Sequence, residues 1–156
     1  MSETVGIGII TCNRRESIKE EWYDYIVVVN DGNTPVYNAQ SPVIGTAGME
    51  GVGKAKNKAL TYLQEKNCDY IILIEDDMLF KKNLFKQYIE AYKSTGIHHF
   101  MFGYHGPANK AGISGGGPVP RKVIDYGELK IALNRDCVGA VCFYTKECLN
   151  KVGIYD

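Results

Sequence analysis

The sequence predicts an α/β sandwich of three layers, in which helices cover both faces of a mostly parallel central sheet. Apolar segments without polar alternation occur at residues 5–10, 25–29 and 70–74, as expected for strands that are buried on both faces. Segments of helical period lie between and after them, and strands that alternate with helices are typical of this fold class. The 156 residues are enough for one domain with a hydrophobic core.

The first two strands are each followed by a polar turn. Residues 5–10 alternate apolar side chains with glycine and end at Thr11-Cys12-Asn13, and residues 14–23 could form a short helix. The second strand is a β-branched run at residues 25–29, closed by the turn residues Asn30-Asp31-Gly32-Asn33.

Helical period begins at Val52, and five apolar residues share one face: Val52, Ala55, Ala59, Leu60 and Leu63. The remaining expected elements are a strand at residues 70–74, a helix at 83–92, strands at 99–104 and 138–144, and a helix at 145–152. The glycine-rich stretch 112–120 is expected to be either a mobile loop or an ordinary surface connection.

Composition excludes several functional classes. Eighteen basic and eighteen acidic side chains cancel, so no overall field favours nucleic acid. No apolar stretch approaches the roughly 18 residues of a membrane span, and the polar first residues do not resemble a signal peptide. The five cysteines match no zinc pattern, and reduced thiols in a cytoplasmic protein are the simplest interpretation.

Three polar turns are expected at one edge of the sheet. Thr11-Cys12-Asn13, Asn30-Asp31-Gly32 and Glu75-Asp76-Asp77 each directly follow an apolar strand. In open α/β sheets, ligands bind beyond the carboxyl ends of the strands, so these turns are the candidate site. Asp31 could accept hydrogen bonds from a base or a ribose hydroxyl, although an Asn-Asp-Gly sequence is usually just a turn.

The three consecutive carboxylates of Glu75, Asp76 and Asp77 indicate a divalent cation. They repel one another unless a cation is present, and all-oxygen ligation suits Mg²⁺ or Mn²⁺. In an extended backbone Glu75 and Asp77 lie on the same side and Asp76 on the other. A metal ion held there could bridge a diphosphate and neutralise its charge as it leaves. The alternative is a solvated acidic turn that caps the next helix.

A second nucleotide-binding pattern competes with this interpretation. Residues 48–55 have the spacing of a P-loop, but Ala55 stands where Ser or Thr would bind Mg²⁺. The loop also does not directly follow a first strand, so a P-loop NTPase is the less favoured alternative.

The order of these motifs resembles that of the inverting family-2 glycosyltransferases and their GT-A relatives. The opening Val5-Gly-Ile-Gly-Ile-Ile-Thr-Cys-Asn13-Arg14 resembles the family's first strand and turn, and Ile26-Val-Val-Val-Asn-Asp31-Gly-Asn33 resembles its strand ending in Asp-Asp-Gly-Ser. Similar matches follow along the chain at Gly51 to Asn57, Asp69 to Leu79, Gly139-Ala140 and Glu147 to Asp156. The resemblance implies the GT-A fold and a nucleotide-diphosphate sugar as donor, which we expect to be UDP-linked. It also implies transfer of the sugar to an acceptor hydroxyl.

The resemblance also implies roles for individual residues. Asp77 would be the direct metal ligand, with Glu75 acting through water or the sugar. The donor pocket would be lined by Thr11, Cys12, Asn13, Asp31, Lys56, Asn57, Glu75 and Asp76. In that pocket Asp31 would contact the base, Asp76 the ribose, and Lys56 the base or the diphosphate.

Three departures from the family pattern matter. Asn30 replaces the first aspartate of the usual pair, and the segment between Asn13 and Tyr25 is short. The sequence also ends at Asp156, before the family's acidic base motif, so no catalytic residue is identified, and His98, His99 and His105 are expected to be structural or surface residues.

The chain is therefore expected to be one GT-A domain, in which residues 1–104 bind the nucleotide sugar and residues 105–156 begin an incomplete acceptor-side half. A non-catalytic nucleotide-sugar-binding module remains an alternative to an enzyme. The acceptor, whether glycan, lipid or protein, is not predicted, and exposed edges could permit a homo-oligomer.

Overall fold

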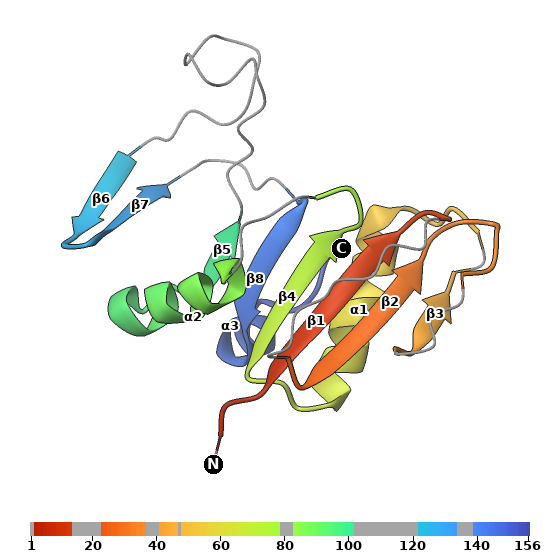
Figure 1. Ribbon diagram of the computed structural model, residues 1–156, viewed down its shortest axis with the longest axis horizontal. Coiled ribbons are helices and arrows are strands. Elements are labelled where there is room, and N and C mark those ends of the chain that lie inside the picture. The colour runs from red at the N-terminus through yellow and green to blue at the C-terminus, as the bar shows by residue number, and fades with distance from the viewer. Residues whose placement is uncertain are drawn as a thin grey trace, which may run out of the picture.

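A six-stranded, mostly parallel sheet forms the centre of the molecule (Figure 1). The computed structural model describes residues 2–13, 23–36, 41–46, 48–78, 83–101, 122–133 and 139–156. The strands run in the order β3-β2-β1-β4-β8-β5, and β8 runs opposite to the other five described strands of this sheet. Their bounds are β1 Val5–Thr11, β2 Tyr25–Asn30, β3 Val43–Gly45, β4 Tyr70–Glu75, β5 His99–Met101 and β8 Val141–Thr145.

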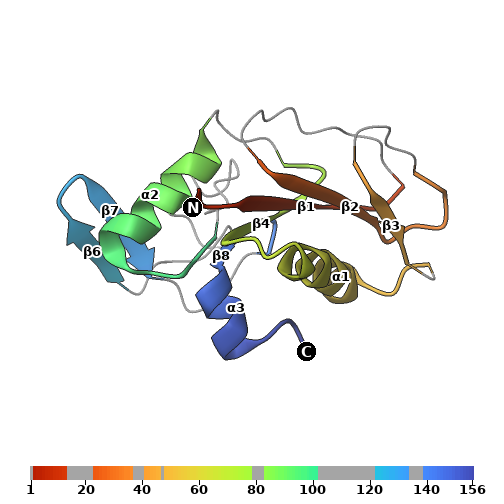
Figure 2. The ribbon, with the colours of Figure 1, turned by 90° about the horizontal axis from the view of Figure 1, so that it is seen from below.

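Helices cover both faces of this sheet, which confirms the predicted three layers. Helices α1 (Val52–Glu65) and α3 (Lys146–Val152) lie on one face, and α2 (Leu84–Thr95) lies on the other (Figure 2). Each face has its own apolar cluster, one containing Leu60 and Leu63 of α1 and the other Phe85 of α2. Burial from both sides explains why β1 and β4 lack polar alternation.

Two glycines in β1 allow α1 to lie close to the sheet. A methyl group at Gly8 would come within 2.7 Å of Leu73 and 2.8 Å of Ala59, and one at Gly6 would come within 2.8 Å of Leu63. The alternation of glycine with apolar residues in this strand is therefore a packing requirement, because a side chain at either glycine would occupy the space in which α1 packs.

Most predicted elements are present, with small shifts at their ends. Helix α2 continues to Thr95, and β8 begins at Val141. The strand expected at 99–104 is described only as far as Met101. Of the short helix predicted at residues 14–23, the structure describes only residue 23. The loop predicted at 112–120 and His105 also lie outside the described residues.

Two further features have no counterpart in the sequence-based prediction. The edge strand β3 has only three residues, too short for a periodicity signal. The hairpin of β6 (Lys122–Tyr126) and β7 (Leu129–Leu133) forms a separate two-stranded sheet. It turns at Gly127, which has φ 80° and donates its N–H to Asp125 Oδ1 over 2.8 Å.

The C-terminal part of the chain belongs to the same sheet as the N-terminal part. Strand β8 lies between β4 and β5, and its Phe143 is fully buried. The predicted division into two halves at residue 104 stays a prediction. Among the described residues, no helix has both the length and the apolar character needed to cross a membrane.

Candidate functional site

The three polar turns lie side by side because their strands are neighbours and parallel. In the strand register Thr11 pairs with Asn30 of β2, and Ile10 pairs with Glu75 of β4. The carboxyl ends of β1, β2 and β4 therefore meet at one edge of the sheet, as the sequence predicted.

The turns after β1 and β4 are joined directly. The Thr11 hydroxyl donates to Asp76 Oδ2 over 2.5 Å, and the Asp76 N–H donates to the carbonyl of Ile10 over 3.1 Å. Thr11 is buried, and Asp76 is half-buried. A hydrogen bond between a hydroxyl and a carboxylate is among the stronger ones in proteins, so it holds the Asp76 side chain in one orientation.

Asn30 organises the turns after β1 and β2. Its Oδ1 accepts the N–H of Asn13 over 2.9 Å and the N–H of Gly32 over 3.2 Å, while its Nδ2 donates to the carbonyl of Thr34 over 2.8 Å. An aspartate has no donor for that carbonyl, which gives a physical reason for asparagine at this position. Asn30, which stands in place of the first aspartate of the family pattern, therefore has a structural role.

Asn13 adopts a left-handed backbone conformation with φ 64°, and its side chain fills the space beside Gly32. The Asn13 Oδ1 atom accepts the N–H of Thr34 over 2.8 Å, and a methyl group at Gly32 would lie only 1.9 Å from that oxygen. Cys12, the middle residue of this turn, is exposed.

Asp31 uses both carboxylate oxygens to bind the start of α1. Its Oδ1 accepts the Thr46 hydroxyl over 3.0 Å and the Glu50 N–H over 2.8 Å, and its Oδ2 accepts the Gly51 N–H over 3.0 Å. Gly51 is the N-cap residue of α1 and has no side chain of its own to cap the helix. A carboxylate at that end also interacts favourably with the helix dipole. The predicted contact between Asp31 and a base stays a prediction.

Lys56 lies inside the molecule and contacts the end of β4. Its Nζ donates to Glu75 Oε1 over 2.8 Å and to the carbonyl of Gly139 over 2.5 Å. The Lys56 side chain is 5% exposed and that of Glu75 32%. The structure therefore joins two predicted site residues, Lys56 and Glu75, in an ion pair.

Asn57, the next predicted site residue, binds the C-terminal segment. Its Nδ2 donates to the carbonyl of Tyr155 over 2.7 Å, and its Oδ1 accepts the Tyr155 N–H over 2.9 Å. This pair of bonds fastens residues after α3 to the middle of α1. The sequence offers no signal for it, because the two residues are 98 positions apart.

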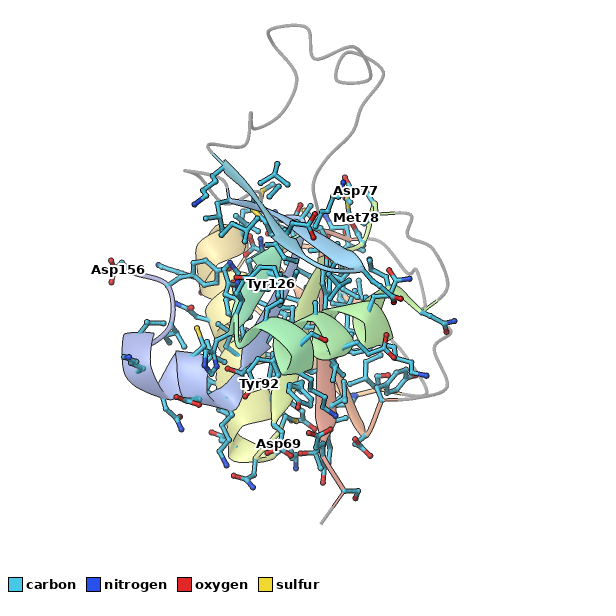
Figure 3. The ribbon with its side chains drawn as sticks, turned by 90° about the vertical axis from the view of Figure 1, so that its left-hand side faces the viewer. Asp69, Asp77, Met78, Tyr92, Tyr126 and Asp156 are labelled. Carbon is cyan, nitrogen blue, oxygen red and sulfur yellow. The ribbon has the colours of Figure 1, made fainter. Side chains whose placement is uncertain are left out.

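Asp77 is exposed at the tip of the turn after β4 and lies far from Asp69, at the opposite edge of the sheet (Figure 3). Within the described ranges, no group of three His, Cys, Asp or Glu side chains is arranged to hold a metal ion. The oxygen donors present, Asp77 and Asp76, nonetheless suit Mg²⁺, which usually binds one or two carboxylates and takes its other ligands from substrate phosphates and water.

The P-loop alternative is not supported by the geometry of the loop. In a P-loop, backbone N–H groups surround the phosphates of the nucleotide. Here the N–H groups of Glu50 and Gly51 donate to Asp31 instead. Together with the missing hydroxyl at Ala55, this leaves residues 48–55 as the capped start of a helix.

Comparisons with known proteins agree with the predicted fold. No family model matches the sequence. The chain is 32% identical over 66 residues to "Uncharacterized glycosyltransferase R363" of Acanthamoeba polyphaga mimivirus, a match that covers 42% of this chain and 26% of that protein. The structure is also similar to the crystal structure of S. aureus TarS 1-349, with a TM-score of 0.60 and 15% identity over 97% of this chain.

The chain spans half the length of the TarS structure and about a quarter of the viral protein. The prediction of a GT-A-like glycosyltransferase fold is confirmed.

Proposed function

We propose that this chain is the donor-binding part of a metal-dependent glycosyltransferase, which moves a sugar from a UDP-linked donor to an acceptor hydroxyl. The observation that carries the proposal is the junction of the turns after β1, β2 and β4, where the Thr11 hydroxyl holds Asp76 on a glycosyltransferase fold. Ligands of open α/β sheets bind at this edge.

In this proposal, the residues at this edge of the sheet have different roles. Asp31, Asn30 and Asn13 hold the turns that would form the walls of the nucleotide pocket. Thr11 holds Asp76 in one orientation for a ribose hydroxyl. Asp77, the exposed carboxylate, would bind Mg²⁺ or Mn²⁺. When bound, the ion supplies positive charge that stabilises the departing diphosphate.

The leading experiment is calorimetric titration of UDP into the protein with and without Mn²⁺, repeated on Asp77→Asn. We expect UDP to bind tightly only with the metal. Asp77→Asn should weaken that binding by about 10- to 100-fold, the loss that is typical when a residue of a metal site is replaced. The matched control is Asp69→Asn, an equal change of charge at the opposite edge of the sheet.

Two outcomes would reject the proposal. One is binding of ATP with Mg²⁺ while UDP is ignored, and the other is equal loss of UDP affinity in Asp69→Asn and Asp77→Asn. If UDP binds as expected, release or transfer of a labelled sugar from UDP-sugars then separates a chain that turns over from a donor-binding module.

A further inference from the structure

A buried ammonium group lies directly beneath the acidic turn after β4. Lys56 reaches it from α1 and bonds to Glu75 Oε1 over 2.8 Å and to the carbonyl of Gly139 over 2.5 Å. These are charge-assisted hydrogen bonds from a side chain that is only 5% exposed. An ammonium taken out of water at this depth needs such partners, because burial of an unpaired charge is very costly.

Gly139 makes the space that the ammonium occupies. A methyl group at position 139 would lie 2.6 Å from Lys56 Nζ, closer than side-chain carbons approach other atoms. The Lys56 ammonium therefore lies against bare backbone, between the turn before β8 and the end of β4. Moving it would break both of its hydrogen bonds.

The pairing changes the charge of the acidic cluster. Glu75, Asp76 and Asp77 carry three negative charges when ionised, and Lys56 offsets one of them through Glu75. A cation in the cluster would otherwise be attracted by all three carboxylates. Lys56 and a divalent ion thus compete for the same glutamate.

We infer that Lys56 is a positioning residue that acts as an internal counter-cation: it holds Glu75 away from the metal, so that the metal binds firmly only together with the donor diphosphate. The inference rests on the proposed function. With Glu75 engaged, the ion has too few protein carboxylates for tight binding, and the diphosphate oxygens complete its shell. Metal and donor then bind cooperatively.

The test measures Mn²⁺ binding by electron paramagnetic resonance, without and with saturating UDP. Lys56→Met removes the ammonium and keeps most of the side-chain volume. We expect it to bind Mn²⁺ alone about tenfold more tightly than the unaltered chain, since a unit charge a few ångströms from a divalent ion has an effect of this order in a water-like dielectric. The gain from adding UDP should shrink accordingly. If the role of Lys56 were purely structural, Lys56→Met would weaken Mn²⁺ binding instead.

Lys58→Met is the matched control. Lys58 is on the same helix and pairs with Glu50 over 3.2 Å, not with Glu75. Its replacement therefore removes one positive charge without releasing the Glu75 carboxylate. The Mn²⁺ affinity of this variant should stay within about twofold of the unaltered chain, because Lys58 pairs with Glu50 and not with a carboxylate of the acidic cluster, and solvent screens a half-buried charge in part. An equal rise in both variants would show a general charge effect and overturn the inference.

The double variant Lys56→Met/Glu75→Gln keeps the test valid if Lys56→Met alone does not fold. It replaces the ion pair by a neutral pair and leaves the net charge of the cluster unchanged. We expect it to bind Mn²⁺ alone as weakly as the unaltered chain and to retain tightening by UDP. Loss of Mn²⁺–UDP binding in this variant would make Glu75 a direct ligand and reject the inference. If the unaltered chain binds neither UDP nor Mn²⁺ with UDP, the proposed function itself fails, which is a different result.

Discussion

The carboxylate of Asp31, directly after β2, accepts the N–H of Gly51 over 3.0 Å and so caps helix α1, which begins at Val52, 21 residues further along the chain. The same carboxylate also accepts the N–H of Glu50 and the hydroxyl of Thr46. A residue expected to contact a ligand is thus also part of the framework that shapes the site.

Asp31→Ala should destabilise the fold as well as the site. Removal of the carboxylate leaves two backbone N–H groups at the start of α1 without their acceptor, and loss of a helix cap costs about 1–2 kcal/mol. Asp31→Asn keeps one acceptor oxygen and should lose less. Urea denaturation followed by circular dichroism measures both. Equal stability of Asp31→Ala and the unaltered chain would contradict the capping role.

Gly8→Ala should loosen the packing of α1 on the sheet. The added methyl group would overlap Leu73 and Ala59, both fully buried, and overpacking of a core typically costs about 1–3 kcal/mol. Gly45→Ala is the control, because a methyl group there meets no atom within 4 Å. The difference between the two free energies of unfolding tests whether Gly8 is a contact point or merely a flexible residue of the strand.

Cys12 should react with a thiol reagent in the folded protein, and UDP with Mn²⁺ should slow that reaction. Cys12 is exposed in the turn after β1, at the proposed donor site. Cys68 serves as the internal control, because burial raises the pKa of its thiol to about 11 and leaves little thiolate at pH 8. Peptide mass spectrometry after timed alkylation reports both residues. An unchanged alkylation rate of Cys12 in the presence of UDP and Mn²⁺ would place the donor elsewhere.

The free energy of unfolding should fall as the pH is lowered through about 6.5, in part because of His99. Burial lowers the pKa of His99, whose Nδ1 lies 2.8 Å from the carbonyl of Phe143 and whose ring stacks on Tyr144. The unfolded chain, with an ordinary histidine pKa of about 6.5, binds more protons than the folded chain in this range. Stability therefore rises with pH there and is lost on acidification.

His99→Gln removes this titration and should flatten the pH dependence between pH 7 and pH 5, even if it lowers stability at pH 8 through loss of the ring. Urea midpoints at several pH values measure the slope. An unchanged slope in the variant would assign the acid sensitivity to other groups.

Much of the framework follows from local patterns in the sequence. The unbroken apolar runs of β1, β2 and β4 and the polar turns after them predict buried parallel strands with their loops at one edge. The strand register confirms that these turns meet. Helix α1 is likewise predicted by its apolar period, and the resemblance of the motifs predicts the glycosyltransferase fold.

Other elements carry too little local signal. Strand β3 has only three residues, and β6 and β7 pair with each other outside the main sheet, where no buried face imposes an apolar pattern. The position of β8 between β4 and β5, antiparallel to both, depends on pairing with segments that lie far away in the sequence, such as Tyr70 with Thr145 and His99 with Tyr144, which no local pattern records.

The sequence by itself determined which strands are buried, where their polar turns fall, and that Thr11, Asp31 and Asp76 share one edge of the sheet. Only the tertiary structure decided what those side chains bind: Lys56 turns inward to Glu75, 19 residues away, and Asn57 holds Tyr155, 98 residues away. The physical reason is that burial and turn conformation depend on neighbouring residues, whereas a hydrogen bond or an ion pair depends on which distant groups the packed core brings within about 3 Å.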